Sequence, residues 1–227
     1  TTITKQDGLA SNVALAVHAS RDGSTWISSW GSGLSRYVDG KVEVLNTTNG
    51  LPSNFVMALT ETRDGSLWTG ADYNGPLLRI KDGKTTVFEH KGHHEPPALS
   101  EDERGLLWIG NRGNLETWDG SKFRRYTSRN GLTDDEVNAI CGGADGAVWI
   151  GTVGGLTRWQ AGKFQNLAAS NALLRVMILS LYHDADDSLW IGTKGKGLLR
   201  WRAGAVQEFN HQSGMFSDSI YAILEDH

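Results

Sequence analysis

The strongest concentration of chemically versatile side chains is a histidine-rich stretch near the middle of the chain. His90, His93, His94 and Glu95 place four side chains of the metal-ligating type within six residues. Zinc sites favour defined ligand spacing and ordered groups behind the ligands, and adjacent histidines are not a usual pair. We therefore interpret the stretch as an irregular solvated loop and expect no metal ion and no cofactor.

Two isolated histidines are the other candidates for catalysis. His18 and His183 lie in apolar stretches and are candidates for lining a channel, although satisfied structural histidines are the favoured interpretation. The sequence contains no Gly-x-Ser-x-Gly, Walker or His-Glu-x-x-His pattern. We expect no catalytic residue, and enzymatic activity is the remotest of three functional hypotheses.

Short glycine-containing stretches carry aromatic, amide and cationic side chains that suit ligand binding. Exposed aromatic rings beside amides and charges can stack on sugar rings, whereas the alternative is that these rings pack on neighbouring loops. Because variable loops on a rigid scaffold commonly carry function, we expect a carbohydrate or small-molecule site. Its candidate residues are Trp30, Tyr73, Asn74, Arg112, Lys194 and Lys196.

Composition excludes several other classes of partner. The formal net charge is −4, and no basic run or aromatic–basic interleaving is present, which argues against nucleic-acid binding. No apolar run reaches the roughly 18 residues of a membrane helix, so we expect no membrane contact by these residues. Cys141 is the single cysteine, which excludes an internal disulfide bond.

The elements that must position these side chains follow from a sequence period. Five tryptophans are separated by 42, 40, 41 and 41 residues, and we assign them to the core: Trp26, Trp68, Trp108, Trp149 and Trp190. An Asp-Gly or related turn precedes each of them by about four residues, and another turn follows about a dozen residues later. Asp-Gly is a strong hairpin signal because a type I′ turn needs positive φ at both central residues.

Each period therefore contains four strand-length segments, which is the spacing of a β-propeller. We predict an all-β propeller, residues 1–227, of four-stranded antiparallel blades with five complete repeats. The expected blades lie near 11–46, 53–89, 96–127, 135–168 and 175–210. Residues 132–137 and 173–182 resemble helices locally, but the repeat register places them in first strands, and helix propensity is a weak signal.

The repeat resembles that of the two-component-regulator propeller family. The combined motif is clearest in Gly50-Leu51-Pro52-Ser53-Asn54 with Asp64-Gly65-Ser66-Leu67-Trp68, and in residues 145–158 with Gly162-Lys163-Phe164. The third repeat departs from it and has His93-His94-Glu95-Pro96-Pro97 in place of Gly-Leu-Pro. The fifth has Asn171-Ala172-Leu173.

This resemblance implies a sensor region of bacterial hybrid histidine kinases, located in the periplasm or otherwise outside the cytoplasm. It implies a non-catalytic ligand-sensing domain that recognises oligosaccharides or another cue, with any kinase elsewhere in the protein. The alternative is a protein-interaction or dimerisation scaffold, and a propeller lyase acting through His18 or His183 is a distant third hypothesis.

Single strands are expected at both ends of the chain, at residues 1–6 and 218–226, because these segments match parts of further repeats. The resemblance implies a ring of seven blades, of which this chain would be a part, and a ring of six blades is the alternative. Since unpaired strand edges and uncovered blade faces promote association, we expect the chain to self-associate.

Overall fold

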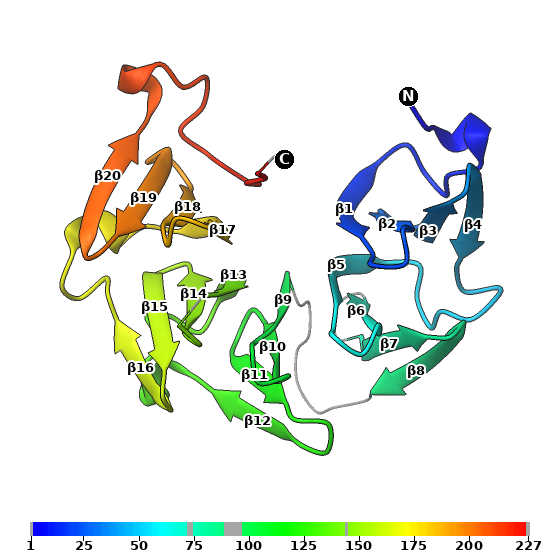
Figure 1. Cartoon of the computed structure of the whole chain (residues 1–227), viewed down its shortest axis with the longest axis horizontal. Coiled ribbons are helices and arrows are strands. Elements are labelled where there is room, and N and C mark those ends of the chain that lie inside the picture. Colours follow the sequence, from blue (N-terminus) through cyan, green and yellow to red (C-terminus); the bar gives the residue numbers. More distant parts are fainter. Residues whose placement is uncertain (1, 72–74, 89–96, 144, 226–227) are drawn as a thin grey trace. The chain divides into compact units, whose positions relative to one another are not determined.

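The chain folds into small antiparallel sheets joined in sequence order (Figure 1). The computed structural model describes residues 2–71, 75–88, 97–143 and 145–225. Within these residues, twenty strands form five four-stranded sheets, and the only helices are 3-10 turns of three residues. No helix in this part of the chain has the length and apolar character needed to cross a membrane.

Two sheets lie in the first of two compact units, which spans Thr1–Glu101. The first sheet consists of β1 (Ala14–Ala19), β2 (Thr25–Ser29), β3 (Gly33–Val38) and β4 (Lys41–Leu45). The second sheet consists of β5 (Val56–Glu61), β6 (Leu67–Ala71), β7 (Leu77–Lys81) and β8 (Lys84–Phe88).

The second compact unit spans Asp102–His227, and the division falls within the third sheet. That sheet consists of β9 (Ala98–Glu101), β10 (Leu107–Gly110), β11 (Leu115–Trp118) and β12 (Phe123–Tyr126). The fourth consists of β13 (Val137–Gly142), β14 (Val148–Thr152), β15 (Gly155–Gln160) and β16 (Lys163–Asn166). The fifth consists of β17 (Ile178–His183), β18 (Leu189–Thr193), β19 (Leu198–Arg202) and β20 (Ala205–Phe209).

The predicted fold class is therefore confirmed, and every strand falls inside the blade limits expected from the tryptophan period. Neither helix-like stretch forms an α-helix, but the register assigned too much of each to a strand, because residues 132–136 and 175–177 lie before the strands begin. Residues 137–142 and 178–183 are first strands of their sheets, and only Ala172–Leu174 forms a 3-10 turn.

The two recurring turns of each repeat differ in backbone conformation. The turn between the third and fourth strands has positive φ at both central residues in four of the five described sheets, as at Asp39 (50°) and Gly40 (78°), which is the expected type I′ geometry. In the third sheet Gly120 has positive φ and Asp119 does not. In the turn before the tryptophan strand, Gly23 has positive φ and Asp22 does not. The type I′ expectation is wrong for this turn because the Asp22 carboxylate accepts the backbone N–H of Ser24 (2.9 Å) and holds a different turn.

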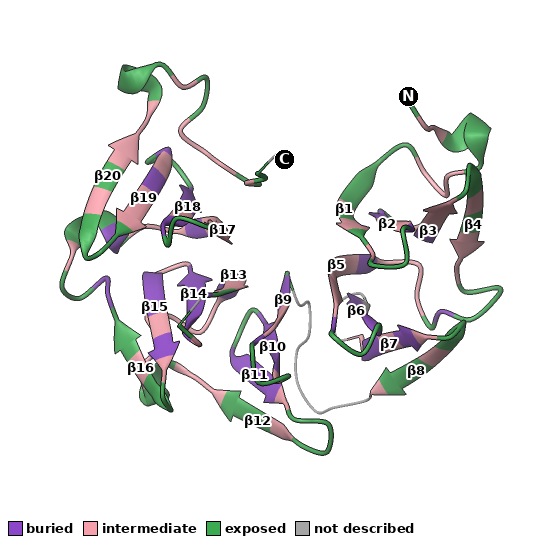
Figure 2. Cartoon of the chain, viewed as in Figure 1, coloured by how far each residue is buried: buried purple, intermediate pink, exposed green. Residues whose placement is uncertain are grey.

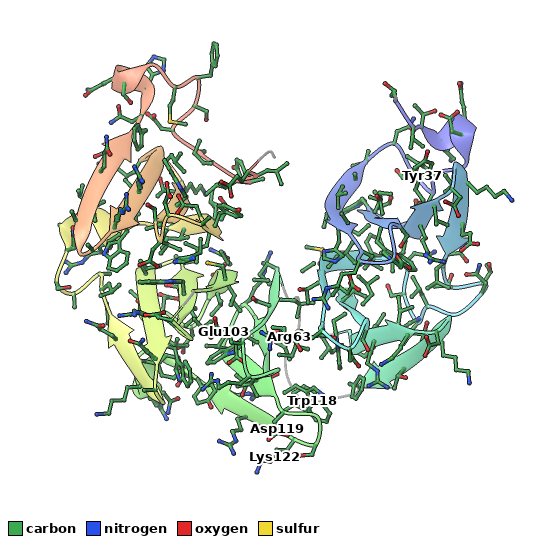
Figure 3. All side chains as sticks on the ribbon, in the orientation of Figure 1. Tyr37, Arg63, Glu103, Trp118, Asp119 and Lys122 are labelled. Carbon is green, nitrogen blue, oxygen red and sulfur yellow. The ribbon has the colours of Figure 1, made fainter. Side chains whose placement is uncertain are left out.

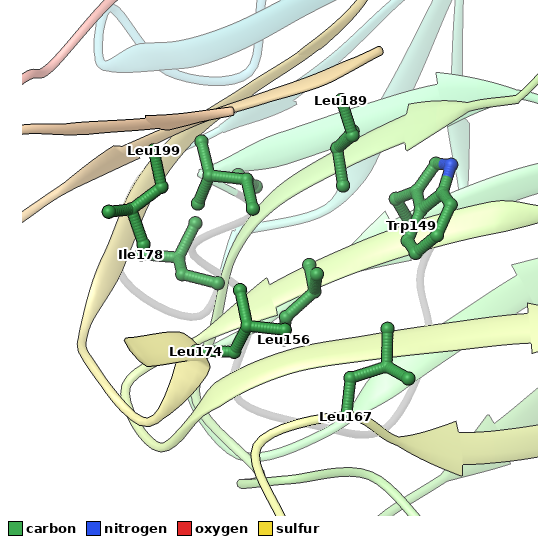
Figure 4. Close-up of a cluster of buried hydrophobic side chains, with 9 residues drawn as sticks. Trp149, Leu156, Leu167, Leu174, Ile178, Leu189 and Leu199 are labelled. Carbon is green, nitrogen blue, oxygen red and sulfur yellow. The ribbon is translucent and has the colours of Figure 1, made fainter. Parts of the chain in front are cut away.

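Consecutive sheets pack through apolar side chains, as the fourth and fifth sheets show (Figure 4). Trp149 and Leu156 of the fourth sheet share one buried cluster with Ile178 and Leu189 of the fifth. The glycine of the Trp-Ile-Gly motif permits this approach, since a Cβ atom on Gly151 would lie 2.4 Å from Cγ2 of Ile178. The repeated glycine is thus explained by packing between sheets.

The burial of the five periodic tryptophans is uneven, although buried residues concentrate on the central strands (Figure 2). Trp68, Trp108 and Trp149 are buried, with exposed fractions of 4%, 1% and 2%. Trp26 and Trp190 are only partly buried. Three of the five side chains are therefore buried, and the partial exposure of Trp26 leads to the cleft described below.

The terminal segments differ from the single strands expected at residues 1–6 and 218–226. Lys5–Asp7 forms a 3-10 turn, because Thr4 caps it and Gly8 ends it in the left-handed conformation. The same turn recurs at Ser128–Asn130, after the fourth strand of the third sheet. In the C-terminal segment, the described pairing is an isolated bridge between Ser219 and Lys194.

The buried indole of Trp68 provides a test of the core. Its ring lies 5.2 Å from that of Phe88, and its Nε1 donates to Oγ1 of Thr62 (3.1 Å). Trp68→Ala should lower the free energy of unfolding by ~3–5 kcal/mol, because it leaves a cavity. Trp30→Ala, at a side chain that is 56% exposed, should change it by about 0.5 kcal/mol or less. Equal urea-denaturation midpoints for the two variants would contradict the core assignment.

Candidate functional site

Two sets of loops meet in the first unit. The backbone N–H of Gly33, the first residue of β3, donates to the carbonyl of Asn54, in the loop that enters the second sheet (2.8 Å). The Asn54 side chain in turn accepts the backbone N–H of Thr47 (2.8 Å). We call the surface formed by residues 29–33 and 46–55 the looped face of the first unit.

Trp30 projects from this face. Its side chain is 56% exposed, and its ring meets that of Phe55 edge-on, with centroids 5.6 Å apart and an interplanar angle of 88°. Gly31, with φ of 66°, makes the reversal that lifts Trp30 away from the sheet, and a Cβ there would lie 3.4 Å from the Phe55 ring. Phe55 therefore steadies the indole from one side while much of its surface meets solvent.

The three cationic candidates lie on loops of the second unit. Arg112 follows β10, and Lys194 and Lys196 follow β18; all three side chains are exposed. The loop after β18 has a fixed backbone, since the N–H groups of Gly195 and Gly197 both donate to the carbonyl of Asp218 (2.8 Å each). The loop after β18 therefore holds its two lysines on a hydrogen-bonded backbone.

The structure thus associates Trp30 with Phe55, a residue that the sequence did not single out, and places the cations on the other unit. Tyr73 and Asn74 lie outside the described residues, as does the histidine stretch at 90–95. One sequence feature could have identified Phe55 as part of this surface. It is a large apolar residue directly after the Ser53-Asn54 turn, at a position where the fourth repeat has Glu136.

The two isolated histidines each have a carboxylate partner. Nε2 of His18 lies 3.5 Å from Oε2 of Glu61, and Nε2 of His183 lies 3.0 Å from Oδ1 of Asp187. Burial raises the pKa of the Cys141 thiol to about 12, which makes it unreactive. Across the described ranges, no group of three or more His, Cys, Asp or Glu side chains is arranged to hold a metal ion.

A cleft of about 840 Å³ opens in the first unit, on the side of the Asp-Gly turns, and the sequence did not predict it. Its floor is apolar and comes from both sheets of the unit: Trp26, Leu45, Leu67 and Ile80. Its walls and rim carry the charged side chains Arg21, Asp22, Arg36, Glu43, Glu61, Arg63, Asp64, Lys81 and Asp82. Small-molecule sites are lined mainly by apolar and aromatic side chains with a few polar groups, and this cleft combines such a floor with a more strongly charged rim.

Two carboxylates beside the cleft, Asp22 and Asp64, are held in their ionised form. The Ser24 hydroxyl and backbone N–H both donate to Asp22 and lower its pKa from 3.8 to about 2. Burial raises the pKa of Asp64, but hydrogen bonds from Thr62, Lys81 and Ser66 outweigh it, so the pKa lies well below its ordinary value. The Arg36 guanidinium also pairs with Asp22 (2.8 Å).

Comparison with known proteins identifies the repeat. Residues 50–73, 131–154 and 173–195 match the model of the two component regulator propeller family. The chain carries two component regulator propeller repeats. The matched segments span the entry loop, first strand and tryptophan strand of the second, fourth and fifth sheets. The sequence comparison with curated proteins gives no match.

Solved structures share the propeller fold. The extracellular domain of a putative hybrid two component system from B. thetaiotaomicron aligns with a TM-score of 0.75 and 23% identity, over 92% of this chain and 30% of that domain. Virginiamycin B lyase from Staphylococcus aureus aligns with a TM-score of 0.74 and 21% identity, over 92% of this chain and 72% of the lyase. The chain thus spans less than a third of the first of these structures, and such low identities establish the fold alone.

The turn carboxylates make stability depend on pH in a defined direction. Asp22 and Asp64 bind protons more weakly in the folded state, so the free energy of unfolding should fall as pH decreases from about 4 to about 2. Asp22→Asn should reduce this slope, as measured by urea denaturation at several pH values. Asp39→Asn, at a turn of the same sheet, is the control. An equal slope in Asp22→Asn and the unaltered protein would contradict the role given to Asp22.

Proposed function

We propose that this propeller segment is a non-catalytic ligand-sensing part of a two-component signalling protein, and that its looped face recognises oligosaccharides outside the cytoplasm. The family repeats and the likeness to extracellular domains of hybrid two component systems support this proposal. The observation that carries it is Trp30, an exposed indole steadied by Phe55 on a loop tied to its neighbour.

The physical argument rests on preorganisation. A pyranose ring presents a face of C–H groups that packs on an aromatic ring, and a ring already fixed in place loses little freedom on binding. Ser32 and Asn54 beside Trp30 supply hydroxyl and amide groups that can pair with sugar hydroxyls. His18 and His183 pair with single carboxylates, which supports a structural role for them and a non-catalytic domain.

Carbohydrate binding through Trp30 is tested by calorimetry against a panel of oligosaccharides. Trp30→Ala should weaken binding at least tenfold, which corresponds to about 1.4 kcal/mol, without changing the melting temperature. Tyr221→Ala removes an aromatic ring that is 72% exposed outside the looped face, and it should leave the affinity unchanged. Binding that is equal in all three proteins, or absent from the panel, would overturn the proposal.

A scaffold function is the second candidate, and the exposed face of β1 favours it. Val13, Leu15 and Val17 have exposed fractions of 58%, 42% and 64%. Ile140 and Leu181 occupy the register position of Val17 in the fourth and fifth sheets, since each pairs with the residue that follows the periodic tryptophan. Both pack against apolar clusters, so this position is built to be covered, and we propose that a second copy of the chain covers it.

Self-association through β1 predicts a concentration-dependent oligomer in sedimentation velocity. Val17→Lys should shift the protein toward the monomer, because it places a charge in the apolar contact. Val87→Lys, on the outer strand β8 at a side chain that is 44% exposed, is the matched control and should not shift it. A monomer at all concentrations in the unaltered protein would exclude this scaffold.

A further inference from the structure

The third strand of every described sheet has one equivalent position. In the second, fourth and fifth sheets the side chain at this position packs against the preceding sheet. Register defines this position, because its residue pairs with the one directly before the periodic tryptophan. The residues in the five sheets are Tyr37, Ile80, Trp118, Trp159 and Trp201; Tyr37 and Trp118 are labelled in Figure 3. Ile80 is the one aliphatic member of this set.

In the second unit, the tryptophan at this position fills the space between sheets. The rings of Trp149 and Trp201 have centroids 4.8 Å apart, and those of Trp108 and Trp159 are 5.1 Å apart. In the first unit, the residue opposite Trp26 is Ile80, and the two belong to one apolar cluster and both line the cleft. The cleft therefore occupies the place of a missing indole ring.

The second unit provides an internal control, because a cleft also lies between its fourth and fifth sheets. Two of its lining residues occupy the same register positions, with Arg158 for Arg36 and Trp201 for Ile80, while Leu167, Ser170, Asn171 and Leu174 come from the segment that joins the two sheets. That cleft has a volume of about 290 Å³, compared with about 840 Å³ in the first unit. The larger volume accompanies the smaller side chain, as packing density requires.

A second position enlarges the same cleft. Leu45 pairs with Leu34 at the register position where the third and fifth sheets carry Tyr126 and Phe209. Those aromatic rings contact the tryptophans of their own sheets, with centroids 6.3 Å apart for Tyr126 and 5.9 Å apart for Phe209. Trp26 therefore lacks a ring neighbour at both positions and remains partly exposed.

We propose that this cleft binds a small neutral molecule with a flat aromatic ring of about indole size. We place the ring of the ligand against Trp26, in the position that the Trp201 ring takes against Trp149. The fourth and fifth sheets therefore show which chemical shape fits the space. Aromatic pairs in such edge or tilted arrangements are favourable beyond the area they bury.

The charged rim determines the net charge and the polar groups of the ligand. It combines four cationic and five acidic side chains, so it attracts neither a strong anion nor a strong cation. The Arg36 guanidinium lies 5.7 Å from the Trp26 ring centroid and already pairs with Asp22, which leaves the opposite side of the indole for the ligand. Glu43, 67% exposed and 3.5 Å from Arg36, is an acceptor for a ring N–H.

The test uses N-acetyl-L-tryptophanamide as the probe, followed by calorimetry and by saturation-transfer NMR. The unaltered protein should bind it at one site. Ile80→Trp restores the side chain of the other repeats, fills the cleft and should weaken binding at least tenfold. Val87→Trp adds the same ring to the outer strand of the same sheet, and it should leave the affinity unchanged.

Leu45→Phe fills the cleft from the other sheet and should weaken binding as well, which keeps the test valid if Ile80→Trp fails to fold. Circular dichroism melting establishes that each variant is folded. Absence of probe binding to the unaltered protein, or equal binding by the folded Ile80→Trp and Leu45→Phe variants, would overturn the proposal. Cellobiose binding that is lost in Ile80→Trp, without probe binding, would also overturn it in favour of a sugar. Trp30→Ala should leave probe binding intact, so this test is independent of the looped face.

Discussion

The contact on which the structure depends is the one between the tryptophan of one sheet and the third-strand residue of the next. A sheet of four strands, each four to six residues long, exposes two apolar faces and cannot bury them by itself. The pairs Trp108–Trp159 and Trp149–Trp201 close these faces with large rings, and the glycine at position 151 lets the backbones approach. Each sheet therefore obtains its stability largely from its neighbours.

The periodic tryptophans also form hydrogen bonds with the turns that precede them. Nε1 of Trp108 and of Trp190 donates to Asp102 and Asp184 (3.0 and 2.7 Å), six residues earlier in each case. Burial raises the pKa of Asp102, but the hydrogen bonds from Trp108 and Arg104 outweigh it and keep the carboxylate ionised. The fourth repeat has Gly143 at this position, and among the described residues the Trp149 Nε1 has no partner. A single repeated indole thus joins turn, strand and neighbouring sheet.

Functional variety on such a scaffold arises where one repeat departs from the others. Trp30 stands where the third, fourth and fifth repeats have Arg112, Val153 and Lys194, and it meets solvent, while Ile80 replaces a ring and opens a cleft beside Trp26. The two lie on opposite sides of the first unit, one among the connecting loops and one among the Asp-Gly turns. The repeats preserve packing, and individual substitutions generate the two proposed sites without altering strand register.

The sequence by itself determined the architecture, because its period fixes where each strand begins and which residue is central. The tryptophan spacing and the turns located all five sheets and overrode the helical appearance of residues 173–182. The sequence also singled out Trp30 as a candidate ligand-binding residue, with packing on a neighbouring loop as the alternative. Tertiary structure alone decided which rings meet: Phe55 beside Trp30, and Ile80 opposite Trp26. Those contacts join residues about 25 and 54 positions apart, and local pattern carries no information on how two sheets fill the space between them.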